Sequence, residues 1–153
     1  MNKRLIQLGI ILVIVGAVYY GNKMLNAYWG KEAVGQYAFA IYDLDRAKAL
    51  AAEQGKLVLA DYSAIWCPSC RKLSTQVFAQ DSIAGSINAN FIYARLDYDS
   101  EEGKQFAADH ELIGFPRVLV LNPTGEKLVE MPLTFEAPEY LQNLEQVTTR
   151  YLP

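Results

Sequence analysis

The apolar positions of the chain are gathered most densely in its first 20 residues. The segment Leu5–Tyr20 contains one strongly polar side chain, Gln7. Lys3 and Arg4 precede this segment, and Lys23 follows it. A helix over Leu5–Asn22 would be about 27 Å long, which nearly matches a hydrocarbon layer of roughly 30 Å. The pattern therefore predicts that residues 1–22 form a short cytoplasmic tip and one membrane-spanning helix.

Two other interpretations of this segment were weighed against a retained anchor. A cleaved signal peptide needs small residues before the cut. Val15-Gly16-Ala17 offers them inside the apolar run, whereas a cut after Gly21 would place the bulky Tyr19 three positions before it. A buried core helix at the start of a chain would rarely be apolar on all faces. The retained signal anchor is favoured, and the basic residues before it place the remaining chain on the periplasmic or other extracytoplasmic side of the cytoplasmic (inner) membrane, with a single pass.

The pattern changes after the apolar segment. Residues 23–36 have weak periodicity and are interpreted as a tether, and residues 37–153 as one domain. In that domain helical and strand-like periods alternate. Helices are predicted from about 43 to 54, 67 to 78, 81 to 87, 100 to 110 and 137 to 151, and strands over 56–63, 91–97, 117–121 and 127–131. This order predicts an α/β fold whose sheet has a parallel portion and a closing antiparallel hairpin.

Composition narrows the possible classes. The chain has 153 residues, is 52% hydrophobic and carries a net charge of −3. Without residues 1–22, which contain two basic and no acidic residues, 12 basic and 17 acidic residues remain, a net charge of −5. No nucleic-acid partner is expected for so acidic a domain. Two cysteines and one histidine are too few for a four-ligand zinc site without carboxylates.

The two cysteines lie in one short motif, Trp66–Cys70 (WCPSC). Cysteines three residues apart on a helix have Cβ atoms about 5–6 Å apart, close enough for an exchangeable disulfide. If the helix begins at Cys67, its free N–H groups and dipole favour the thiolate there. Arg71 and Lys72 are expected to add positive charge. Cys67 is therefore the predicted nucleophile.

Other uses of the pair were considered. A structural disulfide closing so short a loop would stabilise the fold little. A two-thiolate copper site stays open as an alternative. His110 lies far along the sequence and is interpreted as a helix-end residue without chemistry. The position of the motif between an apolar strand and a helix favours redox use.

Three stretches of the chain resemble the thioredoxin superfamily over roughly residues 43–151. Leu57–Cys70 resembles the strand–WCxxC–helix segment, Ile113–Pro116 the cis-proline loop, and Asn122–Gly125 the turn of the family's hairpin. The stretches 77–81 and 88–91 are similar to the C-terminal exported domain of DsbD-type reductases. The resemblance implies a thioredoxin-like fold, a central mixed β-sheet flanked by helices, preceded here by the membrane helix.

The resemblance also implies roles for particular residues. Asp61 matches the family's buried acid, and a carboxylate at that depth has a raised pKa and could accept the proton of Cys70. The alternative for Asp61 is a polar strand end or an ion pair, for which Arg95 is the candidate partner. Residues expected to contact substrate are Trp66, Phe115, Pro116 and Arg117, the last three through backbone exposed by a cis proline.

The combined expectation is a membrane-anchored, extracytoplasmic thiol–disulfide oxidoreductase, with reduction favoured over oxidation. Cys67 would attack a substrate disulfide and Cys70 would resolve the mixed disulfide. Expected partners are exported cysteine-containing proteins and an upstream thiol electron donor or acceptor in the membrane. No cofactor or metal beyond the cysteine pair is expected. The alternatives are a disulfide-forming oxidase, and a thioredoxin-like binding or assembly module or copper carrier that uses the same face.

Overall fold

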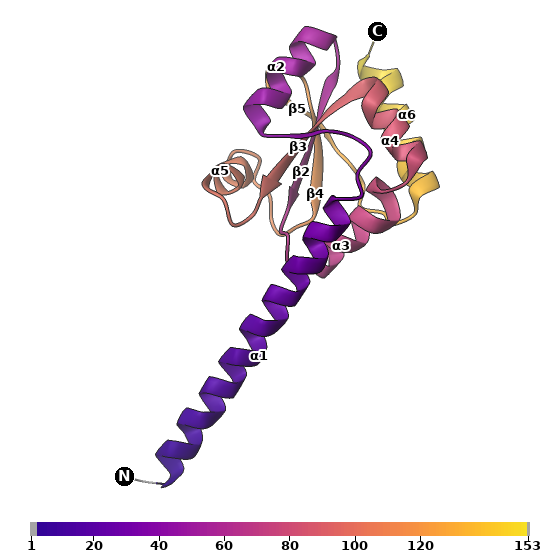
Figure 1. Cartoon of the computed structure of the whole chain (residues 1–153). Helices are drawn as coiled ribbons and strands as arrows, with labels where there is room; N and C mark the ends of the chain where they lie inside the picture. Colours follow the sequence, from indigo (N-terminus) through magenta and orange to yellow (C-terminus); the bar gives the residue numbers. More distant parts are fainter. Residues whose placement is uncertain (1–2, 153) are drawn as a thin grey trace.

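A five-stranded mixed sheet forms the centre of the computed structural model, which describes residues 3–152 (Figure 1). The strands lie in the order β1-β3-β2-β4-β5. Strands β1, β3 and β2 are parallel, β4 runs antiparallel to β2, and β5 runs antiparallel to β4. Their bounds are β1 Ile41–Tyr42, β2 Leu57–Ser63, β3 Phe91–Asp97, β4 Arg117–Leu121 and β5 Lys127–Glu130. The predicted mixed sheet and closing hairpin are confirmed, and β1 is a strand that the sequence pattern did not predict.

Helices cover both faces of this sheet. Helices α2 and α5 pack on one face, and α3, η1, α4 and α6 on the other (Figure 1). Their bounds are α2 Leu44–Gln54, α3 Pro68–Leu73, the π-helix η1 Ser74–Phe78, α4 Asp81–Asn90, α5 Glu101–Asp109 and α6 Ala137–Tyr151. The fold is therefore a thioredoxin-like α/β sandwich. The helix predicted over 67–78 consists of α3 and η1 in succession.

The strands are apolar on both faces because helices bury both. In β2, Leu57 and Leu59 face the cluster that contains α4 and α6, whereas Val58 and Ala60 face the cluster that contains α2 and α5. Asp61 and Ser63 lie on the same face as Leu57 and Leu59. Two polar side chains are therefore buried at the end of the central strand β2. That end is followed directly by the cysteine motif, which places the candidate chemistry beside the two polar groups.

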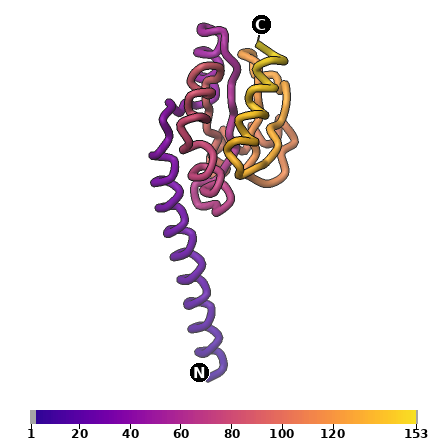
Figure 2. The backbone as a smooth tube through the Cα atoms, turned by 90° about the vertical axis from the view of Figure 1, so that its right-hand side faces the viewer, coloured from indigo at the N-terminus to yellow at the C-terminus, as the bar shows by residue number. Residues whose placement is uncertain are grey.

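Helix α1, Lys3–Val34, is much longer than its apolar segment. It projects from the sandwich as one continuous rod in both views (Figures 1 and 2). Its length and composition fit a single transmembrane helix. Residues 23–36 were interpreted as a tether, but in the structure α1 continues through 23–34 and buries Gly30 and Ala33 against the domain. Small residues such as Gly30 and Ala33 contribute little to a hydrophobic period, which explains why residues 23–34 showed weak periodicity.

Candidate functional site

The cysteine motif forms the start of α3, with Cys67 as the residue that caps it. The Cys67 Sγ accepts a hydrogen bond from the Cys70 backbone N–H at 3.2 Å. Pro68 occupies the first helical turn, where no intrahelical N–H is needed. Both cysteines are free thiols, and Cys67 and Cys70 are 6% and 4% exposed. The predicted start of the helix at Cys67 is confirmed.

The pKa values of the two thiols are shifted in opposite directions. A hydrogen bond from the Cys70 side chain, supported by the backbone N–H groups of Cys70 and Ser69, lowers the pKa of Cys67 to about 6. The same contact with Cys67, together with burial, raises the pKa of Cys70 well above its usual range. At neutral pH the pair therefore holds one proton, and that proton is on Cys70. This is the ionisation that an attacking Cys67 and a resolving Cys70 require.

The expected contribution of the two basic residues after the motif is not what the structure shows. Arg71 lies over the Trp29 ring, with its guanidinium carbon 5.0 Å from the ring centre. Lys72 lies over Phe135, with Nζ 4.3 Å from that ring centre. Neither is among the groups that lower the pKa of Cys67, which are the hydrogen bonds at the helix start. The helix start, rather than flanking charge, favours the thiolate.

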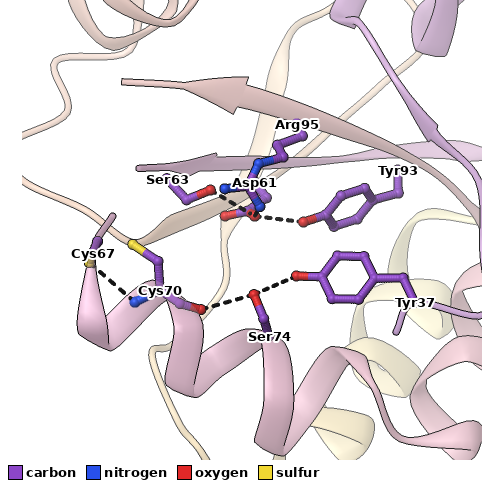
Figure 3. A network of polar contacts seen from close by, with 8 residues as sticks. All are labelled: Tyr37, Asp61, Ser63, Cys67, Cys70, Ser74, Tyr93 and Arg95. Carbon is purple, nitrogen blue, oxygen red and sulfur yellow. Dashed lines mark hydrogen bonds and ion pairs between the residues drawn. The ribbon is translucent and has the colours of Figure 1, made fainter. Parts of the chain in front are cut away.

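Asp61 lies on β2, next to the cysteine turn, and its two carboxylate oxygens have different surroundings (Figure 3). Its Oδ2 accepts hydrogen bonds from the Tyr93 hydroxyl at 2.6 Å and the Ser63 hydroxyl at 3.1 Å. Arg95 Nη1 is 3.8 Å from the same oxygen. Within residues 3–152, Oδ1 is buried without a hydrogen-bond partner. One oxygen is thus held in place while the other is free to accept a proton.

Burial raises the pKa of Asp61, and Arg95, Tyr93 and Ser63 oppose that rise. Asp61 also affects both cysteines electrostatically, since its negative charge raises the pKa of Cys67 and of Cys70. The structure therefore brings together the acid and the cysteine pair that the sequence analysis connected. The predicted Asp61–Arg95 pair is present, with the two residues directly opposite each other in the β2–β3 register.

Two aromatic side chains of this network were not predicted as site residues. Tyr93 lies two positions before Arg95 on β3, on the same face of the sheet. Tyr37 packs against Tyr93 and Phe78, and its hydroxyl donates to Ser74 Oγ at 2.7 Å, which in turn donates to the Cys70 carbonyl at 3.0 Å. The period-two spacing of Tyr93 and Arg95 was a usable signal for Tyr93. No local signal marks Tyr37, which reaches the site from the segment after α1.

Trp66 lies beside the cysteines in a small aromatic group. Its indole N–H donates to Asp99 Oδ2 at 2.7 Å, and its ring meets Phe115 edge-on with centroids 5.5 Å apart. Ala64, Cys67 and Cys70 form a buried cluster against which Trp66 and Phe115 pack. Trp66 therefore covers the pair from one side, as the prediction that it shields the thiols requires.

The loop before β4 borders a groove of about 580 Å³. The Phe115–Pro116 peptide bond in this loop is cis, and Phe115, Pro116 and Arg117 line the groove. The Arg117 guanidinium donates to Glu130 Oε1 at 2.6 Å and to the Ile113 carbonyl at 3.2 Å. The Arg117 side chain therefore holds the loop to β5, and contact between the Arg117 backbone and a substrate stays a prediction.

No three His, Cys, Asp or Glu side chains are grouped as a metal site within the described range of 3–152. The copper alternative would use Cys67 and Cys70 alone as thiolate ligands. His110 ends α5 and its ring packs on Phe106, at a centroid distance of 4.5 Å.

Sequence comparison connects this site with known proteins. The family model described as thioredoxin-like matches residues 40–123. The chain is 33% identical over 96 residues to the thiol:disulfide interchange protein DsbD 2 of Pseudomonas aeruginosa, covering 61% of this chain and 16% of that protein. It is 28% identical over 135 residues to DsbD of Pseudomonas fluorescens, covering 84% of this chain and 22% of that protein. The chain spans about a fifth of the length of these relatives.

Solved structures support the same fold. A thioredoxin from Thermus thermophilus superposes with a TM-score of 0.66 at 24% identity, covering 74% of this chain and 89% of that one. The oxidised C-terminal domain of DsbD from Neisseria meningitidis superposes with a TM-score of 0.56 at 20% identity, covering 70% and 98%. At these identities the likeness establishes the fold.

Proposed function

This chain belongs to the thioredoxin-like family, and from that premise we propose that it is a membrane-anchored, extracytoplasmic thiol–disulfide oxidoreductase that reduces disulfides of exported proteins. The observation that carries the proposal is the position of Cys67 at the start of α3, where its Sγ accepts the Cys70 backbone N–H at 3.2 Å, and this position favours the Cys67 thiolate beside a protonated Cys70. The free Oδ1 of Asp61 beside them supplies the proton acceptor that the second step needs.

The proposed reaction has two exchanges. The Cys67 thiolate attacks one sulfur of the substrate disulfide, that disulfide breaks, and the departing sulfur leaves as a thiolate that takes a proton from water. Asp61 Oδ1 then accepts the proton of Cys70, whose thiolate attacks the Cys67 sulfur in the mixed disulfide. The second substrate sulfur leaves Cys67 as a thiolate and takes a proton from water. The products are a Cys67–Cys70 disulfide and a substrate dithiol, so two electrons pass from the chain to the substrate.

Substrate would lie in the groove beside the cis-proline loop. An extended segment there meets the Phe115 and Arg117 backbone and could pair with it as an added strand. Ile113 and Leu133 border the groove and are 85% and 56% exposed, so its edges offer apolar contacts. This arrangement favours unfolded or extended cysteine-containing segments over small polar disulfides.

The direction of transfer depends on the reduction potential of the Cys67–Cys70 pair. We propose reduction because the chain resembles the exported domain of DsbD-type reductases and is similar to two interchange proteins of the DsbD type. A potential near that of thioredoxin, about −270 mV, supports a reductase, whereas one near that of DsbA, about −120 mV, indicates an oxidase. Equilibration of the full chain with dithiothreitol redox buffers measures it.

The activity itself is tested with the pre-reduced full chain in detergent and a soluble disulfide-linked peptide probe. The proposal predicts that each chain reduces one disulfide and ends as the Cys67–Cys70 disulfide. The matched variant Cys67→Ser should reduce none, since its remaining thiol, Cys70, is buried and 4% exposed. Unchanged reduction by Cys67→Ser, or none by the reduced wild type, would remove the proposed function.

A further inference from the structure

Helix α1 packs on the redox domain beginning at the residue where its apolar segment ends. Residues 3–22 are almost all exposed, whereas positions at helical spacing after them are covered: Lys23, Asn26 and Ala27 are partly buried and Gly30 and Ala33 are buried. Positions 23, 26, 27, 30 and 33 are three or four residues apart, so they form one face of the helix. We call this face the docking face of α1. The span and the domain are thus joined by a helix that is packed, with no free linker between them.

The first contact of the docking face is with the side chain that precedes the nucleophile. Lys23 Nζ lies 4.7 Å from the ring centre of Trp66, and 3.8 Å from Asp99 Oδ2. The same Asp99 oxygen accepts the Trp66 indole N–H at 2.7 Å. Lys23, Asp99 and Trp66 therefore form one contact that joins the end of the membrane segment to the residue next to Cys67.

The next contacts are made one turn further along α1. Arg71, on the helix that Cys67 caps, donates to Asn26 Oδ1 at 3.1 Å, and its guanidinium lies over the Trp29 ring. Gly30 approaches the Ile65 backbone so closely that a Cβ on it would lie 1.8 Å from the Ile65 carbonyl oxygen. Contacts on both sides of Cys67, at 65–66 and at 71, thus fix α1 to the cysteine turn itself.

These contacts set the height of the cysteine turn above the membrane. Lys23 and Gly30, which contact it from α1, lie about 2 and 12 Å beyond Asn22 along the helix axis, at 1.5 Å per residue. The headgroup layer on each side of the hydrocarbon core is roughly 5–8 Å thick. Figure 1 shows α1 leaving the domain at the end where α3 begins. The cysteine turn is therefore at about the level of the lipid headgroups.

From this geometry we propose that α1 is a rigid strut that directs the exchange reaction toward disulfides held at the membrane surface by a partner protein's own membrane-spanning segment, and away from disulfides of folded soluble domains. The inference rests on the proposed function and adds the class of partner. A small folded domain is about 30 Å across and does not fit between the cysteine turn and the bilayer. A cysteine pair at the end of a transmembrane helix lies at the required height and needs no such space.

The test uses the pre-reduced full chain in phosphatidylcholine vesicles with two fluorogenic disulfide probes on lipid headgroups. One probe is attached directly, and the other stands on a polyproline spacer of about 8 residues, roughly 25 Å long. A soluble probe with the same disulfide is measured in parallel. The rigid strut predicts that the direct probe is reduced roughly tenfold faster than the raised probe, because only the direct probe has a high effective concentration at the cysteine turn.

A flexible insertion makes the prediction specific to the strut. A Gly/Ser segment of about 12 residues between Asn22 and Lys23 leaves the docking face on the domain and frees the domain from the span. It should raise reduction of the raised probe to near the rate of the direct probe. The same segment placed before Lys3, at the other end of the span, should leave the wild-type difference unchanged.

The outcomes separate this inference from the proposed function. Equal rates on both lipid probes in the wild type, or an insertion that changes neither rate, overturn the strut while reduction of the soluble probe still supports the oxidoreductase. Failure to reduce any of the three probes overturns both. A preference for the direct probe that the insertion removes supports the strut.

Discussion

The thiol of Cys67 is the group whose ionisation the site changes in the direction most useful for exchange. Hydrogen bonds from Cys70 and from the helix start lower its pKa to about 6, against about 8.5 for a free cysteine. We expect the thiolate absorbance of the reduced chain near 240 nm to titrate with a midpoint near pH 6. Cys67→Ser should lose this transition, and a midpoint near 8.5 in the wild type would contradict the assignment.

The same lowered pKa predicts how the stability of the reduced chain depends on pH. The folded state favours the thiolate more than the unfolded state does, so the contribution is fully present above about pH 8.5. This contribution to the free energy of unfolding is lost as the pH falls toward the pKa of Cys67 in the folded chain, about 6. Cys67→Ser should remove this part of the pH dependence in denaturant unfolding measurements.

Tyr93 determines how firmly the Asp61 carboxylate is held. Its hydroxyl donates the shortest hydrogen bond to Asp61 Oδ2, at 2.6 Å. The Tyr93 hydrogen bond favours the charged carboxylate and lowers its pKa, so Tyr93→Phe should raise the pKa of Asp61. The carboxyl ¹³C chemical shift of Asp61 measures this, in a background of Cys67→Ser and Cys70→Ser in which no thiol titrates.

Tyr140 offers the matched control for Tyr93. It is fully buried, and within residues 3–152 its hydroxyl has no hydrogen-bond partner. Tyr140→Phe should leave the Asp61 titration unchanged and raise the free energy of unfolding by about 1 kcal/mol, because an unsatisfied buried hydroxyl is removed. If Tyr140→Phe moves the Asp61 titration as far as Tyr93→Phe does, the effect is not due to the Tyr93 hydrogen bond.

The sequence predicted which of these residues lie together, because Cys67 and Cys70 are marked by their motif, and Asp61 and Arg95 by the resemblance to the thioredoxin superfamily. Their roles in exchange stay predictions. Tyr37 and Lys23 were missed because they reach the site from segments far away in sequence. Arg71 was placed correctly but its effect was wrong, since neighbouring charge in sequence does not say which way a side chain turns.

Among the elements, α1 is the one whose packing has the largest consequence, and Gly30 is its tightest contact. Gly30→Ala would place a methyl group against the Ile65 carbonyl and should weaken the packing of α1 by about 1–3 kcal/mol. We expect faster amide hydrogen exchange over residues 23–34 in the full chain. Gly21→Ala, which meets nothing within 4 Å, is the control in the same helix. Equal protection in the two variants would show that α1 is not held at Gly30.

The elements of the domain were predictable because periodicity and end signals agree. Asp43 caps α2 by accepting from the Arg46 N–H at 2.7 Å, and Gly55 ends it at a positive φ of 66°. Strand β1 was missed because two residues are too few for any period. The extension of α1 to Val34 was missed because its docking face consists of small and polar residues, including Gly30 and Ala33.

In the whole molecule, the long helix α1 and the thioredoxin-like domain are joined by packed contacts at Gly30 and Ala33. The apolar segment is far richer in hydrophobic residues than the 52% of the whole chain, and the domain beyond it is acidic. The mixed sheet, its two helical layers and the single long apolar helix were all predicted from sequence. The relation between the membrane helix and the cysteine turn was not, because it depends on contacts between residues 23–30 and residues 65–71 that no local pattern encodes.

The proposed function depends on one step, the mixed disulfide that Cys67 forms and Cys70 resolves. Trapping by the full-length Cys70→Ala chain in its membrane, followed by mass spectrometry of the reductant-sensitive adducts, tests this step. We expect cysteine-containing proteins linked through Cys67, and their absence when Cys67→Ala is added to the trapping variant. Adducts that persist without Cys67, or a trapping variant that carries none through Cys67, would contradict it.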